Sequence, residues 1–458
     1  MSKLNNHNST NHSNYPSSTT SNPKDIATVT STPSFTLNSS GIPVPTLEYL
    51  QAELSKVTST DQMVGPDSVF AKLFQNTINT VLQAEMEQHL GYASNQKIGV
   101  SKSTGNSRNG YNTKRLKSQY GHVDLDIPRD RKSKFEPEIV AKHQTTTNDL
   151  ENQILALYTM GNSTNEISNH FKQIYGFDIS DQYISIVTEK VLPLVKDWLN
   201  RPLQSIYPIV YLDAIRYKVR EGGGHNGLGG RIIDKAVHIA LGIGLDGKKD
   251  VLGLYISENE SAKFWMSVLS DIKSRGVQDI LICSTDNLTG FTEAIKSIYP
   301  DTKHQKCIVH QIRNSTKFVS YKDLKLFTSD LKIVYTAKDE LQALEQFDIF
   351  KQRWGKDYSY AIKSWENNWS ELMTFMDYPE EIRRLIYTTN PIEGLNRQLR
   401  KTTSKRTIYP NDESVLKNLY LVITKLNEKW TMSVRDWSKI LNQLTIVFED
   451  RITKFIHV

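Results

Sequence analysis

The sequence predicts an α/β fold in which helices cover both faces of a mixed five-stranded sheet. Two observations on residues 203–316 predict it. Apolar runs with the two-residue period of strands alternate there with amphipathic helical segments. Two of these apolar runs also carry an aspartate, and a buried acid is costly unless it faces a cation or a cleft. The sheet is therefore expected to hold a polar site.

The order of the elements indicates the type of sheet. The expected elements are a strand over 207–219, a hairpin over 235–257, a helix over 261–276, a strand over 279–287, a helix over 288–300 and a strand over 303–312. The hairpin turns at Asp246-Gly247, a pair typical of tight turns. This β-β-β-α-β-α-β order is that of an RNase H-like core.

The whole chain divides into six predicted regions. The first is a disordered tail, because its Ser, Thr and Asn residues have few apolar anchors to bury. The second is an N-terminal amphipathic helix, from Asp67 to about Gly91, followed by a basic β-hairpin. The regions are the tail (1–45), the helix and hairpin (46–145), a helix-turn-helix-like region (146–202), the first part of the core (203–316), a helical insertion (317–385), and a glutamate-bearing helix with the C-terminal helices (386–458).

The hairpin is a candidate DNA-binding surface. Val123, Leu125 and Ile127 alternate with acids, as in a strand with one buried face. Basic residues flank this strand and are suited to contact phosphates. A solvated hairpin has the same composition, so the residues alone leave both interpretations open. The candidate DNA-contacting residues are Arg108, Lys114, Arg115, Arg129 and Arg131.

Residues 146–202 predict three helices. The second opens at Ser163 with Glu166 three residues later, which is the pattern of a capping box. The third opens at Ser180 after a Gly-containing turn. Short helices followed by a longer one favour a DNA-binding helix-turn-helix, although helical hairpins that bind no DNA share the pattern.

The insertion is expected to be helical and to bury its tryptophans. Residues 317–385 are too long for a loop and hold Trp354, Trp365 and Trp369. We expect these side chains in the core; the alternative is that one of them stacks on a frayed base.

Asp213 and Asp286 are the candidate metal ligands of the sheet. Asp213 lies within the first apolar strand and Asp286 ends the fourth. In an RNase H-like sheet these strands are neighbours, so the two carboxylates lie side by side. They repel each other unless a cation lies between them, and oxygen ligands favour Mg²⁺ or Mn²⁺. Taken singly, each acid could instead bond to backbone or cap a helix.

A third carboxylate would complete a two-metal site, and Glu393 is the candidate. It lies in "TTNPIEGLNRQLRK", in which Thr389 or Asn390 caps a helix and Pro391 fits the first turn. Arg397 lies four residues beyond the glutamate and Arg400 seven, on the same helix face. A surface salt bridge is the alternative interpretation of this acid.

From about residue 68 to residue 447 the chain resembles the Mutator-type transposases of bacterial insertion sequences. The stretches that carry the resemblance are "HLGY", "RNGY", "PRDR", "YPIVYLDAIRYKVR", "LGLYISENESAKFW", "CIVHQIRNS", "WGKDY", "YTTNPIEGLNRQLRK" and "EKWTM". Members of this family use an Asp-Asp-Glu triad. The resemblance implies that Asp213, Asp286 and Glu393 are both catalytic and metal-binding here.

The resemblance extends to other residues. The family's Cys-x-x-His pair corresponds to Cys307 and His310, and its basic position after the glutamate to Arg400. A single such pair is too few ligands for zinc, so we expect a structural or DNA-proximal role. Arg313, Arg397, Arg400 and Lys401 are predicted to contact DNA. The family's usual Gly after the second aspartate and usual Ser after the glutamate are replaced by Asn287 and Gly394.

The predicted function is that of a DNA transposase. It would bind terminal inverted repeats, cleave transposon ends with Mg²⁺ (or Mn²⁺) and join the 3′-hydroxyl to target DNA as a homodimer or larger homo-oligomer. The net charge of +6 permits a double-stranded DNA partner, and the two cysteines fit a reducing, cytoplasmic compartment. No membrane span is expected. The alternatives are a transposase-derived DNA-binding protein without catalysis and a structure-selective nuclease of the same fold.

Overall fold

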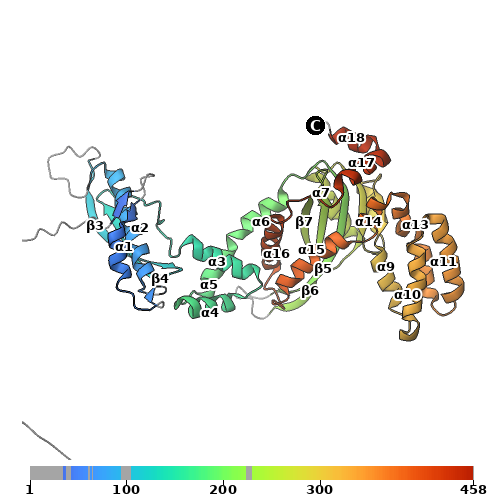
Figure 1. Ribbon diagram of the computed structural model, residues 1–458, viewed down its shortest axis with the longest axis horizontal. Helices are drawn as coiled ribbons and strands as arrows, with labels where there is room; N and C mark the ends of the chain where they lie inside the picture. Colours follow the sequence, from blue (N-terminus) through green and yellow to red (C-terminus); the bar gives the residue numbers. More distant parts are fainter. Residues whose placement is uncertain are drawn as a thin grey trace, which may run out of the picture. The chain divides into compact units, whose positions relative to one another are not determined.

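The computed structural model describes residues 35–37, 43–59, 62–63, 65, 67–93, 105–222 and 230–456 (Figure 1). Most of the predicted tail and residues 223–229 of the glycine-rich hairpin tip lie outside the described residues. The chain forms two compact units. One comprises Met1–Val64, Ser68–Lys114 and Asp124–Lys142, and the other comprises Gly65–Asp67, Arg115–Val123 and His143–Val458.

The first unit is built around the predicted N-terminal helix, α2 (Val69–Leu90). Ser68 caps its start by accepting a hydrogen bond from the backbone N–H of Ala71, and Gly91 ends it with a positive φ of 76°. Helix α1 (Leu47–Leu54) precedes it, and within the segment predicted as a tail β1 (Phe35–Leu37) pairs antiparallel with β2 (Pro43–Pro45). The predicted basic hairpin is formed by β3 (Arg108–Ser118) and β4 (Gly121–Asp130), with residues 115–123 belonging to the second unit.

The second unit begins with a cluster of short helices. These are α3 (Asn148–Thr159), α4 (Thr164–Tyr175), α5 (Asp181–Glu189) and α6 (Val191–Asn200). The predicted capping box is present: Ser163 and Glu166 each bond to the other's backbone N–H. Buried Leu150, Ile167 and Ile184 join α3, α4 and α5 in one small core. The third predicted helix divides at Lys190 into α5 and α6.

A mixed five-stranded sheet follows, as predicted. Its strands lie in the order β7-β6-β5-β8-β9, with β5, β6 and β7 antiparallel and β5, β8 and β9 parallel. The strands are β5 (Ile206–Glu221), β6 (Arg231–Ile243), β7 (Lys249–Ser257), β8 (Asp279–Thr285) and β9 (Lys303–Lys306).

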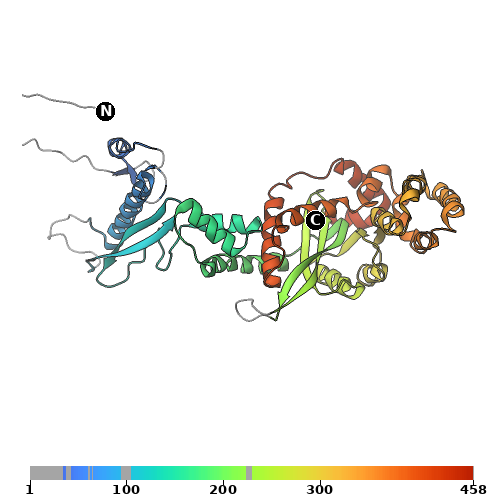
Figure 2. The same cartoon turned by 90° about the horizontal axis from the view of Figure 1, so that it is seen from below.

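Helices cover both faces of this sheet. Val210 and Leu212 of β5 pack with α7 (Ala262–Ser274) and α8 (Phe291–Ile298), whereas Ile209 and Tyr211 pack with later helices on the opposite face. Figure 2 shows the C-terminal helices, in red, on the other side of the sheet from α7 and α8. The alternation along β5 therefore assigns Asp213 to the face covered by the later helices.

The predicted fifth strand is wrong in its second half. β9 ends at Lys306, and the residues after it form α9 (Ile308–Thr316). The N–H of Cys307 makes the last bond to β8, at the carbonyl of Thr285, and the N–H of Ile308 bonds to Tyr387 instead. Without a continuing strand partner, the apolar run turns into a helix, and such short runs fit either structure.

The insertion is helical, and its tryptophans are core residues. Trp354 and Trp365 are buried and Trp369 packs against the same core. The helices are α10 (Tyr321–Tyr335), α11 (Glu340–Trp354), α12 (Ser359–Asn367), α13 (Trp369–Met373), the 3₁₀ turn η2 (Thr374–Asp377) and α14 (Glu380–Ile386). The chain then returns to the sheet through α15 (Asn390–Thr403) and continues as α16 (Asp412–Asn427), α17 (Trp437–Phe448) and α18 (Asp450–Ile456). Within the described parts of the chain, no helix is both long and apolar enough to cross a membrane.

The first residue of α17, Trp437, packs against the turn between β6 and β7. This contact predicts that a larger residue in the turn lowers the stability of the fold. Gly247 has a φ of 76°, and a Cβ there would lie 2.3 Å from Cγ of Trp437. Gly222 has a φ of 73° but open space around its Cβ position. Gly247→Ala should therefore cost about 1–3 kcal/mol more than Gly222→Ala, because only the former overpacks. Thermal unfolding midpoints of the two variants measure the difference; equal midpoints would show that Trp437 does not close on this turn.

Candidate active site on β5, β8 and α15

The two predicted aspartates meet because β5 and β8 are parallel neighbours. Leu212 pairs with Thr285 in the sheet register, and the aspartates follow these two residues directly. Asp213 and Asp286 therefore emerge at the same level of adjacent strands, as the sequence predicts. Each carries a carboxyl group close enough that the charge of Asp213 raises the pKa of Asp286.

Asp213 is held by hydrogen bonds on both oxygens. Its Oδ1 accepts from the N–H of Ala214 at 2.8 Å, and its Oδ2 accepts from Nδ2 of Asn396 at 2.6 Å. Burial raises the pKa of Asp213, which the Ala214 bond and the positive charge of His310 oppose. Asn396 fixes the carboxylate from α15, the helix that also carries Glu393 (Figure 1).

Asp286 is the more perturbed acid. Burial, followed by the negative charges of Glu260 and Asp213, raises its pKa to about 6. Its Oδ1 is buried and has no hydrogen-bond partner among the described residues. A buried oxygen without a donor is unfavourable and is stabilised by a proton or a cation.

Glu393 lies at the start of α15, as predicted, but its partners are basic residues. Its N–H donates to the carbonyl of Thr389, the residue before the helix. Its Oε1 lies 3.3 Å from Nη1 of Arg313 and 3.9 Å from Nε2 of His310, both on α9. In this state the third predicted carboxylate is neutralised by α9 rather than directed at a shared ion.

The three predicted metal ligands are Asp213, Asp286 and Glu393. Within the described residues, no three His, Cys, Asp and Glu side chains are grouped closely enough to hold an ion. The pair Asp213 and Asp286 nevertheless fits a hard divalent cation, since both are oxygen donors whose charged forms are disfavoured without one. Glu393, which contacts Arg313 through Oε1, is not grouped with them in this state.

Cys307 and His310 lie between the acids and the start of α15. Burial raises the pKa of the Cys307 thiol, but hydrogen bonds from His310 and Thr389 outweigh it and leave the pKa below its usual value. The Thr389 hydroxyl lies 3.4 Å from the sulfur. Hydrogen bonding to Cys307 and the nearby aspartates raise the pKa of His310. The structure thus places this pair beside all three carboxylates.

The basic residues predicted to contact DNA differ in their surroundings. Arg397, Arg400 and Lys401 are exposed along α15, and Arg313 is exposed apart from its contact with Glu393. In the hairpin, Arg115, Arg129 and Arg131 are exposed. Arg108 instead bonds to Gln83 and Glu87, and Lys114 donates to the carbonyls of Ala141 and Lys142.

Two residues of the site were missed from the sequence. Asn396 holds Asp213, and Glu260 is close enough to raise the pKa of both aspartates. A signal for Asn396 exists: it follows Glu393 by three residues, next to the apolar Leu395 and Leu399, which indicates the buried side of the helix. Glu260 follows a strand and has no comparable signal.

Paired acids at the same level of neighbouring strands, beside a helix with exposed arginines, are typical of proteins that act on a phosphodiester backbone. Comparison with known proteins agrees with this class. The model of the Mutator family of transposases matches residues 46–433, and the chain belongs to this family. The resemblance predicted from the sequence motifs is thereby confirmed.

Individual relatives are similar over most of their length. A probable transposase for an ISRM3-like insertion sequence element of Sinorhizobium fredii is 39% identical over 391 residues, covering 85% of this chain and 95% of that protein. The transposase for insertion sequence element ISRM3 of Rhizobium meliloti is 38% identical with the same coverage. Among solved structures, the Drosophila P element transposase strand transfer complex matches with a TM-score of 0.27 at 13% identity, covering 67% of this chain and 87% of that one.

The raised pKa of Asp286 predicts a pH-dependent stability. The folded chain keeps this proton up to about pH 6, whereas an unfolded Asp releases it near pH 4, so the free energy of unfolding falls between these values as pH rises. The penalty, on the order of 2–3 kcal/mol, is complete above pH 6. Asp286→Asn should therefore unfold at a higher temperature than wild type at about pH 8 in the absence of divalent metal, and the gain should shrink toward pH 4.

The control for this measurement is Asp301→Asn, which changes an exposed acid. It should follow the wild-type pH profile. A destabilised Asp286→Asn at both pH values would contradict the prediction, because it would mean that the carboxylate is stabilising as an anion.

Proposed function

We propose that this chain is a DNA transposase that binds terminal inverted repeats, cleaves transposon ends by metal-dependent phosphodiester hydrolysis and joins the freed 3′-hydroxyl to target DNA. The observation that carries the proposal is the position of Asp213 and Asp286 at the same level of β5 and β8, with a buried oxygen on Asp286 that no described residue contacts by a hydrogen bond. Membership in a family of transposases supports it.

The sheet supports an RNase H-like core as the catalytic unit. Its first three strands are antiparallel, and β5 neighbours β8, which is the adjacency of the first and fourth strands expected from the sequence. In that arrangement α15 covers the sheet beside β5, so that Glu393 and Asn396 approach from one helix.

Asp213, Asp286 and Glu393 would hold Mg²⁺ (or Mn²⁺). Two such ions supply activation of the attacking oxygen and charge stabilisation of the leaving one. The chain's own residues do the remaining work. Asn396 orients Asp213, and Arg313 with His310 keeps Glu393 paired until a phosphate backbone competes for these cations.

DNA binding is assigned to several surfaces. The exposed Arg397, Arg400 and Lys401 of α15 are suited to neutralise phosphates next to the acids. The α3–α5 helices and the basic hairpin would recognise the inverted repeats. Two ends must be brought together, so we propose at least a homodimer acting on double-stranded DNA in the cytoplasm.

One observation favours a second candidate function. Glu393 forms an ion pair with Arg313, and a glutamate that is neutralised in this way suits a transposase-derived DNA-binding protein that lacks catalysis. The discriminating property is Mg²⁺-dependent chemistry on end DNA, since both candidates bind it.

Replacement of any triad acid should abolish cleavage. Asp213→Asn, Asp286→Asn and Glu393→Gln should each reduce nicking of an inverted-repeat duplex in Mg²⁺ by roughly a thousand-fold or more, because each removes a proposed metal ligand. Gel assays of nicking and of strand transfer into a plasmid measure both steps. Asp301→Asn serves as the matched control with full activity expected.

The outcomes separate the candidates. Wild-type protein that binds end DNA without Mg²⁺-dependent nicking would support the DNA-binding protein. Nicking without strand transfer would support a nuclease. Nicking that survives in Asp213→Asn would remove Asp213 from the catalytic set.

Asn396 is predicted to be a positioning residue. Asn396→Ala removes the donor to Asp213 and should reduce nicking by about 10- to 100-fold, as is typical when a ligand loses its hydrogen-bonding support. Raised Mg²⁺ should recover part of the loss, because the ligand is still present but less well oriented. Gln398→Ala, on the exposed side of α15, is the control. Equal rates for the two variants at every Mg²⁺ concentration would contradict this role.

A further inference from the structure

A polar pocket adjoins Asp286 and has no role in the proposed metal site. Its volume is about 610 Å³. The loop after β8, helix α9 and the inserted helices α12 and α13 all line it, so it lies within one unit of the chain. Asn287, the residue directly after Asp286, is part of its wall.

Two aromatic rings line the pocket and are open to solvent. Phe318 is 67% exposed and Tyr360 is 65% exposed. Their ring centroids lie 5.2 Å apart with planes at 77°, an edge-to-face pair. They come from different segments, since Phe318 follows α9 and Tyr360 belongs to α12. Exposed aromatic faces at the edge of a polar pocket are suited to stack on a planar ligand.

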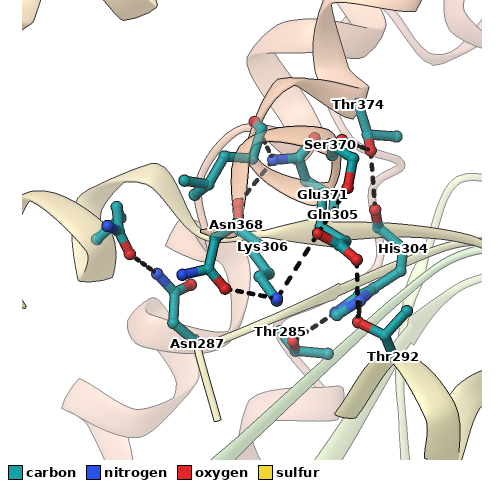
Figure 3. Close-up of polar contacts among 12 residues, drawn as sticks. Thr285, Asn287, Thr292, His304, Gln305, Lys306, Asn368, Ser370, Glu371 and Thr374 are labelled. Atoms are coloured by element: carbon teal, nitrogen blue, oxygen red, sulfur yellow. Dashed lines mark hydrogen bonds and ion pairs between the residues drawn. The ribbon is translucent and has the colours of Figure 1, made fainter. Parts of the chain in front are cut away.

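The pocket wall offers hydrogen-bonding groups of both kinds. Lys306 is nearly buried, donates from Nζ to Oδ1 of Asn368 at 2.7 Å, and lies 3.7 Å from Glu371 (Figure 3). Asn287 donates to Gln311, which leaves its own Oδ1 buried and without a partner among the described residues. The pocket is thus lined by several side-chain amides and by a lysine.

The charges that line the pocket indicate which class of ligand it can bind. Lys306 and Lys317 line the pocket together with Glu293 and Glu371, so its formal charge is close to zero. A polyphosphate would meet two carboxylates there. A single nucleotide fits better, because its base presents a flat face to the rings and a polar edge to the amides, while one phosphate can lie near Lys317.

We propose that this pocket receives one nucleotide that is unstacked from the DNA beside the phosphate to be cut. The inference rests on the proposed function, because it requires a DNA strand at Asp286. Since Asn287 follows Asp286 directly, a strand positioned at the acids has its adjoining nucleotide at the pocket. Unstacking costs free energy, which the aromatic and amide contacts offset.

The test uses the full chain and an end duplex with 2-aminopurine at single positions within three nucleotides of the cleavage point. Ca²⁺ replaces Mg²⁺, so that binding is measured without chemistry. Binding of the wild-type protein should increase the fluorescence of 2-aminopurine at one position, because a base that leaves the stack is no longer quenched by its neighbours. Tyr360→Ala and Phe318→Ala should each reduce the increase roughly five-fold or more, given the usual contribution of one stacking ring.

Tyr321→Ala is the matched control. Tyr321 is 94% exposed on α10 and does not line the pocket. This variant should retain the wild-type fluorescence. In Mg²⁺, a duplex with the responsive base unpaired should also restore cleavage by Tyr360→Ala toward the wild-type rate, because the cost of unstacking is already met. A purely structural defect would not be rescued by the DNA.

The results separate this inference from the proposed function. If wild type cuts end DNA but 2-aminopurine stays quenched at every position, the pocket assignment is overturned and the proposed function is not affected. Equal fluorescence in wild type, Tyr360→Ala and Phe318→Ala also overturns it. If wild type neither binds nor cuts end DNA, the binding of free deoxyadenosine monophosphate is measured instead. Wild-type binding that is weakened in Tyr360→Ala would support a nucleotide pocket whose ligand is a free nucleotide. No binding by wild type would overturn the assignment of a nucleotide pocket.

Discussion

The parallel pairing of β5 with β8 is the constraint on which the rest of the site depends. It brings Asp213 and Asp286 to the same level of the sheet, where burial makes both charges unfavourable. A fold can tolerate such a pair only if something compensates for it. The backbone N–H of Ala214 and the side-chain amide of Asn396 donate to Asp213, whereas Oδ1 of Asp286 has no donor among the described residues. The charged forms of both acids are therefore disfavoured in this sheet unless a proton or a cation compensates.

The position of the third carboxylate depends on a different set of contacts. The turn from β9 into α9 is fixed by the bonds from Cys307 to Thr285 and from Ile308 to Tyr387. The hydroxyl of Thr389 contacts the sulfur of Cys307, which connects this turn to the start of α15. Because α9 and α15 meet there, Arg313 can reach Glu393. The positions of the two aspartates are thus set by the sheet, whereas the position of Glu393 is set by the contact between two helices.

Much of the fold was predictable because its signals are local. The period of the apolar residues predicts β5 to β8, and the capping box at Ser163 predicts the start of α4. The prediction failed at α9, because the apolar run after Lys306 fits a strand or a helix. The N–H of Ile308 bonds to the carbonyl of Tyr387 instead of to β8, and this distant contact ends the strand. Among the candidate DNA contacts, Arg108 bonds to Glu87, a partner 21 residues away that no local pattern reveals. The proximity of the two aspartates could be predicted without knowing any distant side-chain contact, because the order of the strands alone makes them neighbours.

The insertion is part of the site rather than a separate attachment. Asn287 donates to Gln311, and Gln311 donates to Ser364 of α12 at 2.9 Å, so a chain of amides runs from the residue after Asp286 into the inserted helices. Asn287 thereby ties the loop that carries Asp286 to α12. The position of the loop that carries Asp286 therefore depends on the packing of α12 as well as on the sheet.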